Sequence, residues 1–224
     1  MTTADRADTA GPGYDDVLYA AFERRYQQGE DSWSDEGAMR RLVPLLSRHL
    51  EPRAAHVLDL GAGRGPDTLA LLEAGHRVTA TDLLRLPDWD AIERRWGDRV
   101  TFLRGDITEL DLPEGEFDAV VDNGVLHHQD PAHYTEYLAA VHRSLRPGGL
   151  LAVSLFTTVD KRSAGVLNRA EDGRLSRWFT DDEAQSLLNA AGFRTLASEQ
   201  VGRKLAGLAY LLVVASAVPR GDEP

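Results

Sequence analysis

A glycine-rich loop follows the first strongly apolar run of the chain. The run Val57–Leu60 leads into the loop Gly61–Gly65, which has a glycine at every second position, and a helical pattern follows. Glycines let the backbone turn tightly and let a ligand approach the free amides at the start of the next helix. Alone the loop is weak evidence, because such a turn can also serve packing only. It predicts a ligand site when other residues support it.

Carboxylates at the ends of the next two apolar runs give that support. Asp82 closes the second run, 21 residues after Gly61, which is the distance at which an acidic side chain reaches the two hydroxyls of a ribose. Asp106 follows the third run and is placed to accept a hydrogen bond from an adenine amino group. These residues together predict a ligand that contains adenosine.

The spacing and charge of the loop discriminate between adenosine ligands. The dinucleotide fingerprint places its third glycine about five residues after the first, whereas Gly61, Gly63 and Gly65 step by two. Asp59 would oppose two phosphate charges but suits the ammonium and sulfonium of a cationic ligand. A phosphate loop is excluded because no Lys-Ser or Lys-Thr pair follows the glycines. S-adenosylmethionine (SAM) fits this set of residues best.

The elements that position these residues alternate along the chain. Helical patterns separate short apolar runs, and cap residues mark their ends, such as Gly75 and the capping box Thr180–Glu183. This alternation predicts a parallel α/β sheet, with two adjacent antiparallel strands at the end of the chain. The predicted strands are Val57–Leu60, Val78–Thr81, Val100–Leu103, Ala119–Val121, Leu150–Leu155, Phe193–Val201 and Leu208–Val218.

An N-terminal segment precedes this alternation. Residues 1–13 have the composition of a flexible tail, and residues 14–50 predict two amphipathic helices joined by the polar hinge Gln28–Ser34. We expect both helices to cover the carboxyl edge of the sheet as a lid, because that edge is the large open surface of such a fold. Trp33, in the hinge, is then expected to contact cofactor or acceptor.

Composition restricts the partners. The 224 residues carry 25 Lys and Arg against 36 Asp and Glu, a net charge of −11 that disfavours nucleic acid and anionic membranes. There are no cysteines, so thiolate zinc sites and cysteine nucleophiles are excluded. No apolar run approaches the roughly 18 residues of a membrane span. We expect a cytoplasmic protein with a small-molecule partner, either a monomer or a homodimer.

Several motifs together resemble those of class I SAM-dependent methyltransferases. They are Asp59–Gly65, Asp82, Gly105–Ile107, Phe117–Asp122, Leu126–His128 and Leu145–Gly149. The resemblance covers residues 56–218, and it assigns residues 51–218 to a SAM-binding methyltransferase domain followed by a tail at 219–224. It implies a Rossmann-like, doubly wound seven-stranded sheet, mostly parallel with the last strand antiparallel, and helices on both faces.

The same resemblance implies cofactor roles. The glycine loop would hold the methionyl part of SAM, Asp82 the ribose, and Asp106 with Ile107 the adenine. The full set of expected cofactor residues is Asp59, Gly61, Ala62, Gly63, Gly65, Asp82, Leu83, Asp106, Ile107, Asp122, Asn123, Gly124 and Trp33. S-adenosylhomocysteine would be the product. No metal ligand set is expected, because no third ligand converges on the histidine pair.

A narrower resemblance concerns the segment after the fourth strand. Asp122–His128 is similar to the Asp-Arg-Gly segment of thiopurine and tellurite-resistance methyltransferases, with Asn123 in place of the Arg, and Tyr26–Trp33 is similar to their lid. Catalytic candidates are His128, Asp122 and His127. His128 can take a proton from a hydroxyl or thiol near neutral pH, and Asp122 can instead bind the methionyl ammonium. Alternatively, the histidines cap the turn and pack under the cofactor.

The sequence therefore predicts methyl transfer from SAM to an O, N or S atom of a small molecule, by in-line displacement. A second hypothesis is a SAM-binding protein that runs a non-methyl-transfer reaction or acts as a partner subunit. A third, a nicotinamide oxidoreductase, is disfavoured by Asp59 and by the glycine spacing.

Overall fold

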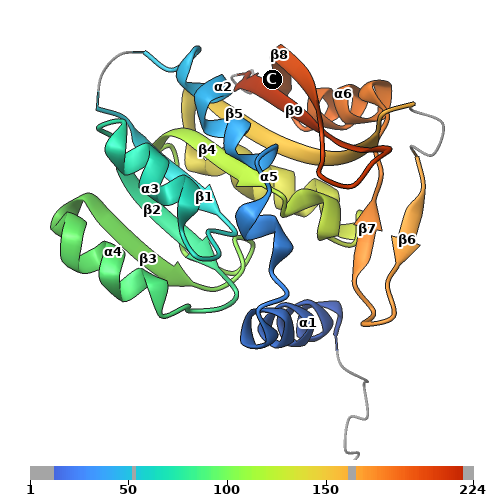
Figure 1. The fold of residues 1–224 in the computed structure, drawn as a ribbon. Coiled ribbons are helices and arrows are strands. Elements are labelled where there is room, and N and C mark those ends of the chain that lie inside the picture. Colours follow the sequence, from blue (N-terminus) through green and yellow to red (C-terminus); the bar gives the residue numbers. More distant parts are fainter. Residues whose placement is uncertain (1–12, 52–53, 161–164, 219–224) are drawn as a thin grey trace, which may run out of the picture.

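A seven-stranded sheet in the order β3-β2-β1-β4-β5-β9-β8 lies at the centre of the computed structural model, which describes residues 13–51, 54–160 and 165–218 (Figure 1). The predicted tails lie outside the described residues, apart from Gly13. The strands are β1 (His56–Leu60), β2 (Arg77–Asp82), β3 (Val100–Arg104), β4 (Phe117–Asn123), β5 (Leu145–Thr158), β8 (Phe193–Gly202) and β9 (Leu208–Ala217).

Strand direction follows the prediction. β1 pairs in parallel with β2 and β4, and β4 pairs in parallel with β5. β9 is antiparallel to both of its neighbours, β5 and β8. The mostly parallel sheet with an antiparallel last strand is thus confirmed. β5 is longer than the predicted strand Leu150–Leu155, because it begins at Leu145 and ends at Thr158.

Helices cover both faces of the sheet. Successive side chains of a strand point to opposite faces, so Val57 belongs to one buried cluster and Leu58 to the other. The first cluster includes side chains of α2 (Leu42–Ser47), α3 (Pro66–Glu73) and α4 (Asp88–Trp96), and the second those of α5 (Tyr134–Ser144) and α6 (Asp181–Ala190). Short 3-10 turns lie at Ser32–Asp35, Met39–Arg41, Gly97–Arg99, Leu126–His128 and Pro131–His133.

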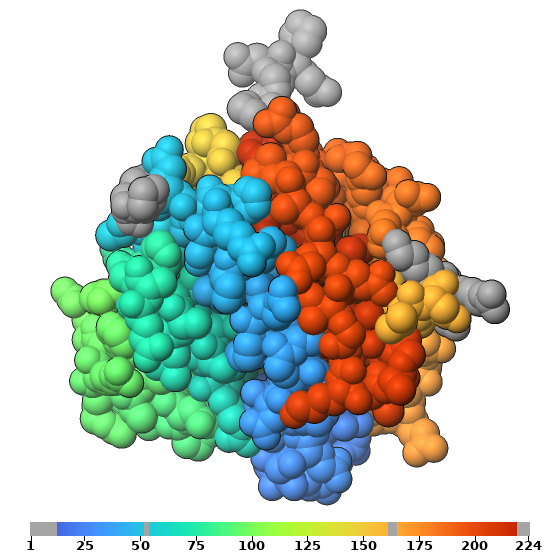
Figure 2. All heavy atoms as spheres, turned by 45° about the horizontal axis from the view of Figure 1, so that its top comes forward, coloured from blue at the N-terminus to red at the C-terminus, as the bar shows by residue number. Residues whose placement is uncertain are grey.

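The two halves of residues 14–50 lie in different places. α1 (Tyr14–Gln28) lies at the carboxyl edge, where its side chains share a cavity with the ends of β1 and β2. α2 instead packs on the face of the sheet, with Leu42 and Leu46 fully buried, between α3 and β9 (Figure 2). The expectation that both helices cover the carboxyl edge is therefore wrong for α2, because its apolar side chains are buried against the face of the sheet.

A small hairpin was not predicted. β6 (Leu167–Arg169) and β7 (Leu175–Arg177) pair antiparallel within the stretch that reads as a mixed polar insertion. Its turn contains Gly173 at φ 86°, next to Val17 of α1. The hairpin and α1 therefore meet at the carboxyl edge of the main sheet. No helix in the described part of the chain is both long and apolar enough to span a membrane.

Candidate active site

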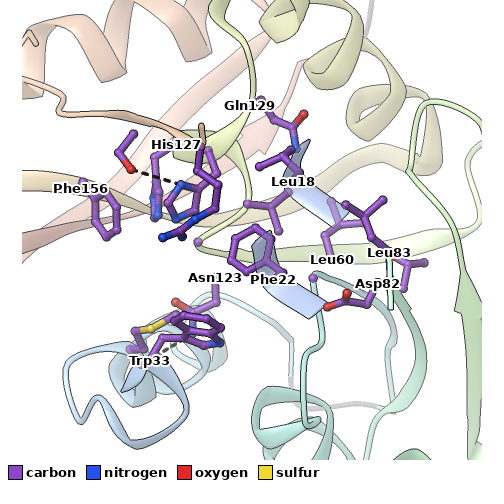
Figure 3. A pocket seen from close by; sticks show the side chains of 18 of the residues that line it. Leu18, Phe22, Trp33, Leu60, Asp82, Leu83, Asn123, His127, Gln129 and Phe156 are labelled. Carbon is purple, nitrogen blue, oxygen red and sulfur yellow. Dashed lines mark hydrogen bonds between the residues drawn. The ribbon is translucent and has the colours of Figure 1, made fainter. Parts of the chain in front are cut away.

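A cavity of about 350 Å³ opens at the carboxyl ends of the central strands, beneath α1 (Figure 3). This volume lies in the range of small-molecule sites. The predicted site residues that line it are Trp33, Gly61, Asp82, Leu83, Asp106, Ile107, Asn123, Gly124, His127 and His128. The predicted residues outside its lining are Asp59, Ala62, Gly63, Gly65 and Asp122.

Asp82 presents its carboxylate to the cavity from the end of β2. One carboxylate oxygen accepts the amide N–H of Leu84 and the other that of Gly63, both at 2.9 Å. Burial raises the pKa of Asp82, and these amides partly offset the effect because they favour the charged form. Each oxygen keeps a lone pair. The carboxylate can therefore anchor the glycine loop and accept ribose hydroxyls at the same time.

The neighbouring strand end supplies an apolar surface and a second carboxylate. Ile107 is buried and lines the cavity. One oxygen of Asp106 accepts from the amide and hydroxyl of Thr108, at 2.7 and 2.6 Å, and its other oxygen has no hydrogen bond within the described residues. An apolar wall between two carboxylates fits the adenosine half of SAM, which has a flat base, an amino group and two hydroxyls.

The glycine loop is shaped by its own packing. Gly63 has φ 53°, and a Cβ there would lie 2.6 Å from the hydroxyl oxygen of Tyr26. Its carbonyl accepts the buried indole N–H of Trp89 at 2.7 Å. Glycine is therefore required at this position because of its positive φ and because the Tyr26 hydroxyl of α1 leaves no room for a Cβ. Direct approach of a ligand, which the sequence suggested, applies to Gly61 alone among the three loop glycines.

Asp59 belongs to a buried polar network behind the loop. It is 1% exposed and accepts the hydroxyl of Thr68. Burial, and then the charge of Asp67, raises the pKa of Asp59. Asn123 joins the network, since its amide donates to Asp67 at 2.7 Å and to the Met39 carbonyl at 2.9 Å. The expected contact of Asp59 with a cationic ligand is thus not what the structure shows: this carboxyl group is held inside the protein.

Asp122 fixes the turn after β4. Its oxygens accept the amides of Gly124, Val125 and Leu126 and the hydroxyl of Tyr137. Burial raises the pKa of Asp122 to about 6. Both expected roles, proton transfer and binding of the methionyl ammonium, need an oxygen that faces the ligand, and the structure directs both oxygens into the turn. An aspartate followed by Asn-Gly is itself a turn signal, which the sequence contained.

His128 lines the cavity. Its Nδ1 lies 2.7 Å from the Leu175 carbonyl, which can only accept, so Nδ1 carries the hydrogen. Nε2 makes no hydrogen bond to any described residue. Since His128 lines the cavity, the lone pair of Nε2 is available to a ligand there. Burial lowers the pKa of His128 to about 4, so the ring is neutral near pH 7. The geometry suits a proton acceptor.

His127 is the more buried of the pair. It is 2% exposed, stacks on Phe156 at 3.6 Å between ring centroids, and its Nδ1 donates to the Ser154 carbonyl at 3.2 Å. Burial lowers the pKa of His127 well below its usual value.

The described residues contain no cluster of three or more side chains that could hold a metal ion.

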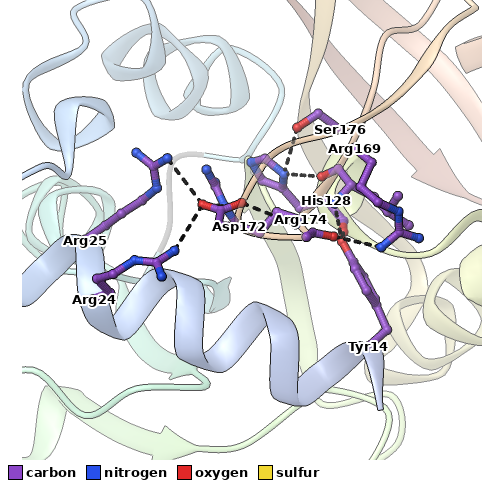
Figure 4. A network of polar contacts seen from close by, with 10 residues as sticks. Tyr14, Arg24, Arg25, His128, Arg169, Asp172, Arg174 and Ser176 are labelled. Atoms are coloured by element: carbon purple, nitrogen blue, oxygen red, sulfur yellow. Dashed lines mark hydrogen bonds and ion pairs between the residues drawn. The ribbon is translucent and has the colours of Figure 1, made fainter. Parts of the chain in front are cut away.

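The hairpin and α1 close the site by a network around Asp172 (Figure 4). Its carboxylate pairs with Arg25 of α1 at 3.3 Å and with Arg174 at 3.0 Å. The Tyr14 hydroxyl donates to the His128 carbonyl at 2.6 Å and accepts the Leu175 amide at 2.8 Å. These contacts join the start of α1, the histidine turn and β7.

Sequence reasoning missed an aromatic and cationic wall of the cavity. Its members come from α1, β5, the hairpin, the segment after β8, and β9: Phe22, Arg25, Phe156, Arg174, Arg203 and Tyr210. They are spread over 189 positions, from 22 to 210, and no local pattern connects them. Only the sheet order brings them together.

Comparisons with known proteins agree with this geometry. A family model described as a methyltransferase domain matches residues 57–149. The 27-O-demethylrifamycin SV methyltransferase of Amycolatopsis mediterranei is 31% identical over 212 residues, which cover 86% of this chain and 76% of that protein. The chain belongs to the class I SAM-dependent methyltransferases. The narrower resemblance to thiopurine and tellurite-resistance enzymes stays a prediction.

A solved methyltransferase structure matches over nearly the whole chain. The 1,6-didemethyltoxoflavin-N1-methyltransferase of Burkholderia thailandensis, with bound 1,6-didemethyltoxoflavin and S-adenosylhomocysteine, is 44% identical, with a TM-score of 0.87. The match covers 95% of this chain and 93% of that one. The chain spans about half the length of the first curated relatives it matches, such as the malonyl-[acyl-carrier protein] O-methyltransferase of Chlorobium phaeovibrioides, 36% identical over 62% of this chain and 55% of the relative.

Proposed function

We propose that this methyltransferase transfers the methyl group of SAM to a nitrogen or oxygen atom of a small planar acceptor. The observation that carries this proposal is the 44% identity, over 95% of the chain, with an enzyme whose structure contains a small-molecule acceptor and S-adenosylhomocysteine. The aromatic lining of the cavity supports a flat acceptor, because Phe22, Trp33 and Phe156 offer ring faces and edges.

The residues of the chain mainly bind and orient. When bound, SAM supplies a methyl group activated by a sulfonium. Asp82 and the glycine loop would hold its ribose and methionyl parts, and the buried side chain of Ile107 would pack against the adenine and exclude water from it. The aromatic wall would hold the acceptor in line, which is the largest contribution to such a reaction. His128 would accept a proton at Nε2 from an acceptor that carries N–H or O–H.

Two measurements test the proposal. Calorimetry of the wild-type protein should show SAM binding and no binding of NAD. Incubation with SAM and a panel of acceptors that includes 1,6-didemethyltoxoflavin should release S-adenosylhomocysteine. Failure to bind SAM would refute the proposal. Binding without methyl transfer to any acceptor would favour the alternative of a non-methyl-transfer reaction, since the same fold also occurs in a [4+2]-cyclase that is 21% identical.

A cytoplasmic location, a monomeric or homodimeric state and the absence of a nucleic-acid partner are part of the same proposal. The net charge of −11 supports the last of these, because it repels phosphate backbones.

A further inference from the structure

The cavity has opposite charges at its two ends. Asp82 and Asp106 lie at the ends of β2 and β3, whereas Arg203 follows β8 and faces Phe156 of β5 and Tyr210 of β9. Four strand steps separate β2 from β9 in the sheet order, which is roughly 19 Å at 4.8 Å a step. The cationic end is therefore remote from the carboxylates that fit adenosine.

Arg203 has no acidic partner among the described residues. Its guanidinium group lies over the rings of Phe156, at 4.7 Å, and Tyr210, at 4.9 Å. Its Nε is buried and makes no hydrogen bond within the described chain. Aromatic faces hold a guanidinium group but accept none of its hydrogen bonds, so its donors stay available. A buried donor without a partner is costly unless a ligand supplies one.

The surroundings of Arg203 leave this end of the cavity positive. Arg25 also keeps a buried Nε without a partner among the described residues. The nearby carboxylate of Asp172 is shared by Arg25 and Arg174. The other nearby carboxylate, Glu36, accepts the backbone amides of Ala38 and Lys204. In a protein with a net charge of −11, this is a local reversal of sign.

We propose that the acceptor binds as an anion: a planar ring whose ionised nitrogen or oxygen is held by Arg203, against the aromatic wall. This inference rests on the proposed function and narrows its substrate class. A cationic cofactor at one end and an anionic acceptor at the other match the charges of the cavity. An acceptor that arrives ionised has no proton to give, so His128 acts only on the neutral form.

The charge of the reacting atom also differs between the substrate and the product. Methylation of the ionised atom removes its negative charge, so Arg203 holds the unmethylated anion more tightly than the methylated product. Loss of this charge therefore favours release of the product.

A matched pair of probes tests the proposal. Lumazine is a planar bicyclic dione with ionisable ring N–H groups, and 1,3-dimethyllumazine carries methyl groups in place of both hydrogens. Calorimetry measures their binding between about pH 6 and 9, with and without S-adenosylhomocysteine. In this window the facing protein groups keep their charge. Burial lowers the pKa of His128 to about 4 and lowers the pKa of His127 well below its usual value. Burial raises the pKa of Tyr210 to about 12 and also raises the pKa values of Tyr26 and Tyr137. Asp82 and Asp106 lie at the far end.

For the wild type we expect lumazine to bind more tightly as pH rises through its own ionisation, and 1,3-dimethyllumazine to bind equally at every pH. Arg203→Gln should weaken binding of the lumazine anion tenfold or more, and Arg203→Lys should keep most of the pH dependence. Affinity for S-adenosylhomocysteine should stay within twofold in both variants, which also shows that they fold. Arg194→Gln, at an exposed position of β8, is the charge-matched control.

Three results would overturn the inference: equal binding of the two probes by the wild type, no binding of either probe, or an Arg203→Gln variant that loses S-adenosylhomocysteine and lumazine to the same extent. Failure of the proposed function appears separately, as a wild type that does not bind SAM, because the probe titrations do not require the cofactor.

Discussion

At the scale of single residues, the site separates groups that touch the cavity from groups that support it. Asp82 does both, since it lines the cavity and holds Gly63 and Leu84 by their amides. Asp122 only supports the turn, although its position at the end of β4 matched the expected pattern equally well. A motif shows that a carboxylate is present, but its hydrogen-bond partners decide what it can do.

The first prediction concerns Asp82. Asp82→Ala should weaken binding of S-adenosylhomocysteine by about 1–3 kcal/mol, because a charge-assisted hydrogen bond to the ribose is lost together with the anchor of the loop. Asp82→Asn keeps one acceptor oxygen and should lose less affinity for S-adenosylhomocysteine. Calorimetry measures both, with the surface variant Asp90→Asn as control. Unchanged affinity in the alanine variant would mean that Asp82 serves the loop only.

The second prediction concerns the titration of His128. Burial lowers its pKa to about 4 in the folded protein, against about 6.5 in the unfolded chain. Between these values the unfolded chain binds the proton and the folded protein does not, so protonation favours the unfolded chain. The contribution of His128 to the free energy of unfolding is therefore complete above about pH 6.5 and is lost as pH falls towards 4.

Urea unfolding of the wild type and His128→Gln at a series of pH values isolates this contribution, because other titrating groups cancel in the difference. The stability advantage of the wild type should shrink as pH falls through that window. The exposed His133→Gln provides the control. A difference that does not change with pH would show that the ring of His128 is solvated.

At the scale of elements, the sequence predicted all seven strands of the main sheet but not the hairpin or the place of α2. The central strands β1, β2, β4 and β5 are marked by apolar runs that must be buried on both sides, a signal each run carries by itself. β6 has three exposed residues and no such signal. Its structure depends on contacts with α1, and α2 depends on which sheet face remains open; both are properties of the assembled chain.

The third prediction tests the junction of α1 with the hairpin. Tyr14→Phe removes the hydrogen bonds to the His128 carbonyl and the Leu175 amide, which should destabilise this junction by about 2 kcal/mol. Hydrogen exchange should then speed up in both α1 and β7, but not in β1 or β4. Tyr19→Phe, which removes a hydroxyl that donates to Glu23 of the same helix, is the matched control. Faster exchange in α1 alone would mean that the two elements are not coupled.

At the scale of the whole molecule, the different positions of α1 and α2 limit the lid to the first part of residues 14–50. α2 is fixed in the sheet face by fully buried side chains. α1 and the hinge meet the rest of the chain through the hairpin, through aromatic side chains such as Tyr26 and Trp33 that are only partly buried, and through ion pairs such as that of Arg64 with Asp31 at 2.7 Å. Segments with few buried apolar contacts open at low cost. We therefore expect the part that moves to end before Met39, which is a smaller lid than the sequence suggested.

The fourth prediction is that cofactor binding protects this smaller lid. Trp33 lines the cavity, meets Phe22 and Tyr26 edge-on, and donates its indole N–H to the Tyr26 hydroxyl at 3.2 Å, so a ligand below it would complete the packing of the hinge. S-adenosylhomocysteine should slow proteolysis and hydrogen exchange within residues 13–35 and leave 39–47 unchanged, because α2 is protected in both states. Trp33→Phe should remove most of the fluorescence change on binding, with Trp96→Phe as control. Equal protection of both segments, or a fluorescence change that survives in Trp33→Phe, would show that residues 14–50 form a fixed brace.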